Sequence, residues 1–123
     1  MAQTVGPYSP VVRAGEWLIC SGQLGLRDGS LVEGGLQAQV TQAVKNVASL
    51  LESEGSGLKD VVKTTVFLTD MANFGAMNDA YVAAFGDNRP ARSAFAVVGL
   101  PLGALVEIEA WAYMSPSPAS SAG

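Results

Sequence analysis

An apolar stretch near the C-terminus contains three charged residues that could do chemistry. Residues 89–114 read RPARSAFAVVGLPLGALVEIEAWAYM and include Arg92, Glu107 and Glu109. Burying a charge is costly unless the charge is paired or hydrogen-bonded. Arg92 could form an ion pair with either glutamate at a subunit interface, or its planar guanidinium could bind a small carboxylate through two hydrogen bonds. The residues alone favour neither role.

Missing residue types exclude several kinds of active site. The chain has no histidine, and Cys20 is its only cysteine. A Ser-His-Asp triad, a Cys-His dyad, an internal disulfide and a CxxC metal site are therefore excluded, and without the commonest zinc ligand no zinc site is expected. Ser21, with no histidine to activate it, is expected to form hydrogen bonds rather than to act as a nucleophile. Tyr8 suits a core anchor and a ligand donor equally well.

Composition limits the partners of the chain. Its 123 residues suit one domain, and 49% of them are hydrophobic while only 15% are charged, too few charges to cover a monomer's surface. Part of the surface is therefore expected to be buried against other subunits. The net charge of −4 and the lack of a basic cluster argue against nucleic acid. Neither a signal peptide nor a membrane span is evident, so a cytoplasmic protein is expected.

Periodicity and breaker residues predict an α+β fold in the order β-β-α-β-α-β-β. The expected strands lie at 10–13, 17–24, 61–69, 91–98 and 105–113, and the expected helices at 36–54 and 72–85. We expect a single domain at 1–113 and a disordered tail at 114–123.

Two helices can cover only one face of such a sheet, so the other face is expected to meet another subunit. If Phe95 and Ile108 pack under the helices, strand alternation places Arg92, Glu107 and Glu109 on the uncovered face. The sequence therefore predicts that Arg92 and Glu107 share a face at or beside a subunit interface.

Several segments together resemble the RidA (YjgF-like) family of reactive intermediate deaminases. They are GPYSP at 6–10, SGQLG at 21–25, VVKTTVFLTDMANFGAMNDAY at 61–81, RPARSAFAV at 89–97 and LPLGALVEIEAWA at 100–112. The resemblance implies a chorismate-mutase-like fold with two helices on one face of a mixed sheet, and a homotrimer with ligand clefts between subunits. It also implies cofactor-free hydrolysis of 2-imino or 2-enamino acids, such as 2-iminobutanoate and 2-iminopropanoate, to 2-oxo acids and ammonia.

The resemblance also assigns roles to residues. Arg92 matches the arginine that binds the substrate carboxylate, and Glu107 matches the glutamate that orients or activates the attacking water. The positions that match the rest of the cleft are Tyr8, Ser21, Gly22, Asn78 and Ala94. Ala94 stands where many members have cysteine, and Pro10 and Val98 also depart from the pattern. A small-ligand-binding or regulatory protein without catalysis on the same scaffold is the alternative.

Overall fold

The computed structural model describes residues 6–115. Its elements, in chain order, are β1 (Val11–Ala14), β2 (Trp17–Gln23), β3 (Leu26–Arg27), β4 (Ser30–Leu31), α1 (Gly35–Glu52), β5 (Val61–Leu68), α2 (Phe74–Phe85), β6 (Ala91–Ala96) and β7 (Val106–Tyr113). All helices and strands expected from the sequence are present. The tail expected at 114–123 lies outside the described residues from position 116 onward. No helix within residues 6–115 is long and apolar enough to cross a membrane.

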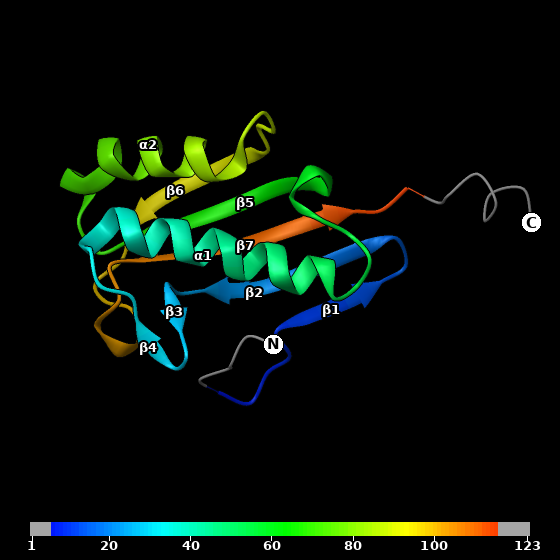
Figure 1. The fold of residues 1–123 in the computed structure, drawn as a ribbon, viewed down its shortest axis with the longest axis horizontal. Helices are drawn as coiled ribbons and strands as arrows, with labels where there is room; N and C mark the ends of the chain where they lie inside the picture. Colours follow the sequence, from blue (N-terminus) through cyan, green and yellow to red (C-terminus); the bar gives the residue numbers. More distant parts are fainter. Residues whose placement is uncertain (1–5, 116–123) are drawn as a thin grey trace, which may run out of the picture.

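The main sheet has five strands in the order β1-β2-β7-β5-β6. Only β5 and β6 are parallel, and the other neighbouring strands are antiparallel. Because parallel strands need a crossover connection, α2 lies between β5 and β6 in the chain. Figure 1 shows α1 crossing in front of β7 and β2, and α2 lying along β6 at one edge of the sheet. The sheet is therefore mixed, as expected.

Helix α1 forms because its apolar residues recur every three or four positions and so share one face. Leu36, Val40, Val44, Val47 and Leu51 are among the residues that this face buries against the sheet. The polar Gln39 is also buried, and its side-chain oxygen accepts a hydrogen bond from the backbone N–H of Leu105 at 2.9 Å. This bond ties α1 to the loop that leads into β7.

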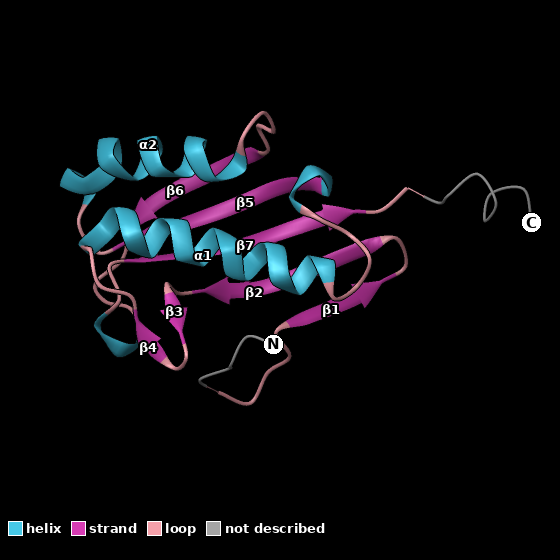
Figure 2. Cartoon of the chain, viewed as in Figure 1, coloured by secondary structure: helices cyan, strands magenta, loops and turns pink. Residues whose placement is uncertain are grey.

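Helix α2 covers the β5–β6 side of the sheet through Met77, Tyr81 and Phe85, which are all buried. Asp70 precedes it, and its carboxylate accepts a hydrogen bond from the N–H of Ala72. After the helix, the side-chain amide of Asn88 donates to the backbone carbonyls of Leu58 and Val61, at the start of β5. Both helices lie on one face of the sheet (Figure 2), which confirms the layer arrangement expected from the sequence.

A small hairpin, β3–β4, was not expected from the sequence. Its two-residue turn is Asp28-Gly29, with φ of 54° and 83°. Positive φ at both positions is typical of a type I′ turn, for which Asp-Gly is a favoured pair. The strands have only two residues each, too short to show alternation, so the turn dipeptide was the available signal.

The structure corrects the expected orientation of β6. Thr64 on β5 lies opposite both Arg92 on β6 and Ala110 on β7, and residues opposite one another in a sheet point to the same face. Because Thr64 and Ala110 are buried under the helices, Arg92 also faces the helices. Glu107 points to the uncovered face, as expected, together with Phe67. The prediction that Arg92 and Glu107 share a face was wrong.

The cause of this error is the parallel pairing of β6. The prediction buried Phe95 because it is large and apolar, but Phe95 is 47% exposed. Its ring makes an edge contact with Phe67 at 5.2 Å between centroids, on the uncovered face. The register with β5 thus sets the orientation of this edge strand, and the bulk of one side chain does not override it.

Candidate functional site

A cavity of about 640 Å³ opens where β2, β7, the β3–β4 hairpin and α1 meet. Four of the residues predicted for the site line it: Tyr8, Ser21, Gly22 and Glu107. Glu109 also lines it, because Glu107 and Glu109 are two positions apart on β7 and point to the same face. We refer to this space as the Glu107 cavity.

Gly22 makes room for the Glu107 carboxylate. The pairing of β2 with β7 shifts register between Cys20 and Gln23, a bulge that contains Gly22. A Cβ atom at position 22 would lie 2.1 Å from Oε2 of Glu107, well inside contact distance. Glycine at this position therefore leaves the Glu107 carboxylate in place, whereas a side chain there would displace it.

Ser21 fastens the N-terminal segment to the edge of the sheet. Its backbone N–H donates to the carbonyl of Pro10 at 2.8 Å, and its hydroxyl donates to the carbonyl of Ser9 at 2.7 Å. These two bonds hold residues 9 and 10 beside β2 and bring Tyr8 to the rim of the cavity. Ser21 thus has the hydrogen-bonding role expected from the sequence, although its partner is the chain itself.

The Glu107 carboxyl has the electrostatics of a potential general base. Burial is the main cause that raises its pKa above the ordinary glutamate value of 4.5, and the nearby charge of Glu109 raises it further. A carboxylate with a raised pKa accepts protons more readily once it is ionised. The ion pairs within residues 6–115 are Arg13–Glu54 and Lys59–Asp60, so no cation is bound to Glu107 in the described chain.

Arg92 lies on the other side of the sheet, against α2. Its guanidinium carbon is 4.9 Å from the ring centre of Tyr81 and 5.6 Å from that of Phe74, and one of its N–H groups approaches Sδ of Met77 at 3.9 Å. It takes part in neither of the ion pairs of the described chain. An ion pair with Glu107 or Glu109 of the same chain is therefore absent, and the half-buried guanidinium retains N–H groups that can bind an anion.

Ala94 lies on β6 with Arg92, and Asn78 lies on α2, the helix that Arg92 contacts. Ala94 faces the helices from β6, opposite Val66, and packs against the core. The side-chain oxygen of Asn78, on α2, is buried and has no hydrogen-bond partner within residues 6–115. We refer to Asn78, Arg92 and Ala94 as the Arg92 edge.

The predicted site residues therefore form two separate groups in one chain. The Glu107 cavity provides a carboxylate, and the Arg92 edge provides a cation, but none of the Arg92 edge residues lines the cavity. A small molecule could not touch Arg92 and Glu107 of the same chain at once, because the sheet lies between them.

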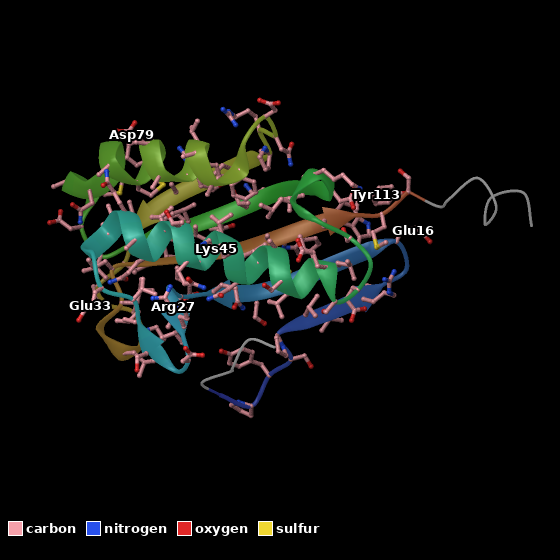
Figure 3. The ribbon with its side chains drawn as sticks, in the orientation of Figure 1. Glu16, Arg27, Glu33, Lys45, Asp79 and Tyr113 are labelled. Carbon is pink, nitrogen blue, oxygen red and sulfur yellow. The ribbon has the colours of Figure 1, made fainter. Side chains whose placement is uncertain are left out.

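Part of the cavity wall was missed by the sequence reasoning. Arg27, on β3 beside α1 (Figure 3), and the polar residues Gln42, Asn46 and Ser49 of α1 also line the cavity. The amide of Asn46 donates to the carbonyls of Leu24 and Leu26 at 3.0 and 2.9 Å and so fixes the hairpin to the helix. The spacing of these polar residues on α1 is typical of a face exposed to solvent. The Asp-Gly pair was the only sequence feature that indicated a hairpin beside this face.

The chain matches known proteins over nearly its whole length. Residues 1–114 match the family model described as endoribonuclease L-PSP. The chain is 44% identical to a 2-iminobutanoate/2-iminopropanoate deaminase of Mus musculus over 91% of its own length and 84% of the relative's. It is 42% identical to a RutC family protein of Pyrococcus horikoshii over 89% and 88% of the two chains.

Solved structures share the fold. RidA from an Antarctic Psychrobacter matches with a TM-score of 0.87 at 40% identity, covering 91% of this chain and 92% of that one. YjgF of E. coli matches with a TM-score of 0.86 at 36% identity, covering 91% of each chain. The chain therefore belongs to the RidA (YjgF-like) family and has its fold, with two helices packed on one face of a mixed sheet.

Proposed function

We propose that this protein hydrolyses small 2-imino and 2-enamino acids to 2-oxo acids and ammonia. The observation that carries this proposal is the half-buried guanidinium of Arg92, which has no carboxylate partner within residues 6–115. On a chain with a net charge of −4, an anionic substrate needs a dedicated cation. Each charge-assisted hydrogen bond to its carboxylate would contribute about 1.5 to 3 kcal/mol. Relatives named for this activity support the assignment.

The proposed reaction uses positioning and proton transfer. Arg92 binds the substrate carboxylate. Glu107 accepts a proton from a water molecule as the water oxygen forms a bond to the imine carbon, and it passes this proton to the imine nitrogen, which gives a carbinolamine. Glu107 then takes the proton of the carbinolamine hydroxyl and passes it to the amine as the C–N bond breaks, so that ammonia leaves and the hydroxyl oxygen becomes the carbonyl of the 2-oxo acid. An imine carbon is already electrophilic, so this sequence requires no cofactor.

We further propose that a neighbouring copy completes each site, in a homotrimer. Arg92 and Glu107 of one chain are on opposite faces of the sheet, so a substrate that touches both must lie between two copies. The uncovered face also has large apolar side chains that remain exposed, among them Phe95, Trp111 and Tyr113. Exposed apolar surface of this kind suits a subunit interface.

The test is release of 2-oxo acid and ammonia from 2-iminobutanoate generated in place by an amino acid oxidase. Spontaneous hydrolysis is subtracted with a reaction that lacks this protein. Arg92→Ala and Glu107→Gln are expected to lower the rate at least tenfold. Arg13→Ala is the matched control. Arg13 lies on β1, at the edge of the sheet opposite to β6, and forms an ion pair with Glu54. Equal rates for the wild type and Arg92→Ala would reject the deaminase.

A binding protein without catalysis is the second candidate. It is favoured by one relative, TdcF of E. coli, whose crystal structure has bound serine and which is 31% identical over 91% of this chain. Calorimetry with 2-oxobutanoate and serine separates the two functions. Binding that depends on Arg92, without any turnover of the imine, would establish the binding protein.

A further inference from the structure

We propose that Tyr81 is a positioning residue for Arg92, and that Thr64 in turn fixes the ring of Tyr81. The face of the Tyr81 ring holds the guanidinium without using its N–H groups in an ion pair, so that these groups stay available to an anion. This inference rests on the proposed function only in naming the anion as the carboxylate of the substrate. The contact between Tyr81 and Arg92 is a property of the fold itself.

Side chains from one face of α2 surround Arg92. Phe74, Met77 and Tyr81 follow one another at three- and four-residue steps on α2, so they share one face of the helix. All three contact the guanidinium, and Tyr81 lies nearer than Phe74, at 4.9 Å against 5.6 Å. Asp79 lies on the outer side of α2 (Figure 3), away from this face. The face of α2 that meets Arg92 is therefore aromatic and thioether in character and carries no carboxylate.

A hydrogen bond to Thr64 holds the Tyr81 ring in place. The hydroxyls of Tyr81 and Thr64 are 2.7 Å apart and hydrogen-bonded, and Thr64 is fully buried. Thr64 is also the residue of β5 that lies directly opposite Arg92 on β6. This hydrogen bond therefore holds the Tyr81 ring against Thr64, the residue that lies directly opposite Arg92. Burial raises the pKa of Tyr81, so its hydroxyl stays neutral and does not compete as an anion for Arg92.

The aromatic contact leaves Arg92 better able to bind an anion than an ion pair would. A carboxylate partner would occupy the same N–H groups that a substrate carboxylate needs. An aromatic face attracts the cation without using those groups. The long side chain of arginine would otherwise lose considerable freedom when a ligand binds, and an already ordered guanidinium lowers that cost. Removing the ring is thus expected to weaken ligand binding more than it slows the chemical step.

The experiment compares Tyr81→Leu and Tyr81→Phe with Phe85→Leu. Phe85 is the matched control because it is buried on the same helix and stacks on Tyr81 at 4.6 Å, and it is not among the rings that contact Arg92. One readout is the Nε–Hε signal of Arg92 in ¹⁵N NMR spectra, assigned with Arg92→Lys. The other is the Kd for 2-oxobutanoate, measured together with KM and kcat.

In Tyr81→Leu, the Arg92 signal should lose the part of its ring-current shift that Tyr81 causes, and Kd and KM should rise about threefold to thirtyfold with a smaller change in kcat. Tyr81→Phe keeps the ring and should restore the signal and most of the affinity. Phe85→Leu should lower the melting temperature and leave both readouts close to wild type. An unchanged Arg92 signal in Tyr81→Leu, or an equal loss of affinity in Phe85→Leu, would overturn the proposal.

If Tyr81→Leu does not fold, Thr64→Val carries the test. It leaves the ring in place and removes its hydrogen bond, so the Arg92 signal should broaden and Kd should rise about twofold to fivefold. No change in either the Arg92 signal or Kd would overturn the proposal.

The NMR measurement also distinguishes the failure of this proposal from the failure of the proposed function. If the Arg92 signal changes in Tyr81→Leu but the wild-type protein has no deaminase activity, the proposed function is rejected and the positioning role stands. If the wild-type protein is active but the Arg92 signal is the same in Tyr81→Leu, the proposed function stands and the positioning role is rejected.

Discussion

Arg92 and Glu107 lie on opposite faces of one sheet. Arg92 shares its face with Thr64 and Ala110 under the helices, and Glu107 shares the other face with Phe67. The cation and the carboxylate that the proposed chemistry needs are therefore separated in a single chain, although both residues are in neighbouring segments of the sequence. Copies of the chain that associate can bring them together, and this relationship leads directly to an experiment.

Mixing two inactive variants should restore activity if each site takes Arg92 from one copy and Glu107 from another. Arg92→Ala chains provide an intact Glu107, and Glu107→Gln chains provide an intact Arg92. After denaturation and refolding of an equal mixture, about a quarter of the sites in randomly assembled trimers should contain both native residues. The deaminase rate should recover to about that share of the wild-type rate.

The control for this experiment is each variant refolded alone, which should stay inactive. Size-exclusion chromatography with light scattering determines whether the mixture assembles. Mixed oligomers that form but recover no activity would contradict a site that takes Arg92 from one copy and Glu107 from another.

Gly22→Ala should disable the Glu107 cavity. The new methyl group would collide with the Glu107 carboxylate, which lies 2.1 Å from the Cβ position, so the carboxylate must move away. We expect a loss of activity of at least tenfold with little loss of stability, because the atoms that must move are the end of the flexible, half-buried Glu107 side chain. Deaminase rates and urea unfolding measure the two effects.

Gly75→Ala serves as its counterpart. Gly75 lies in α2, and nothing is within 4 Å of its Cβ position. Alanine there should stabilise the protein by up to about 1 kcal/mol and leave the rate unchanged. A Gly22→Ala protein as active as Gly75→Ala would show that the position of the Glu107 carboxylate does not matter to the reaction.

The raised pKa of Glu107 makes both stability and activity depend on pH. Burial is the main cause and Glu109 the second, and both favour the protonated form in the folded protein. Since the folded state then binds more protons than the unfolded state, Glu107 lowers stability as the pH rises from 4.5 through the raised pKa. Glu107→Gln should be more stable than the wild type at neutral pH, and this difference should vanish below the unfolded pKa.

Activity, unlike stability, should increase as the pH rises, because only the ionised Glu107 carboxylate accepts a proton. The rate should fall as the pH drops through the raised pKa of Glu107. Glu109→Gln removes the second cause of the shift, so its acid limb should lie at lower pH than that of the wild type. Profiles of kcat/KM against pH, with a substrate-generating oxidase that is not limiting, measure this. Identical acid limbs would show that Glu109 does not affect the reacting group.

The sequence was sufficient for the two helices, the five strands of the main sheet and the layer arrangement because these depend on local patterns, whereas the two-residue strands of the β3–β4 hairpin were missed. Val40, Val44 and Val47 recur at helical spacing, and the β-branched run at 61–69 is too short for a helix. The orientation of β6 depends instead on its register with β5, which involves residues about 28 positions apart, such as Thr64 and Arg92. The separation of Arg92 from Glu107 follows from that register, so no local pattern could reveal it.

The matching family model is described as an endoribonuclease, but we expect no ribonuclease activity from this chain. A net charge of −4 with no histidine provides neither the electrostatic attraction to phosphates nor the usual acid-base group. Titration of a labelled single-stranded RNA at 50 and 200 mM salt should show no binding in the micromolar range. Cleavage should not exceed that of Arg92→Ala purified identically. Binding that weakens steeply with salt, or cleavage that Arg92→Ala abolishes, would show that the Arg92 edge acts on phosphate as well as on carboxylate.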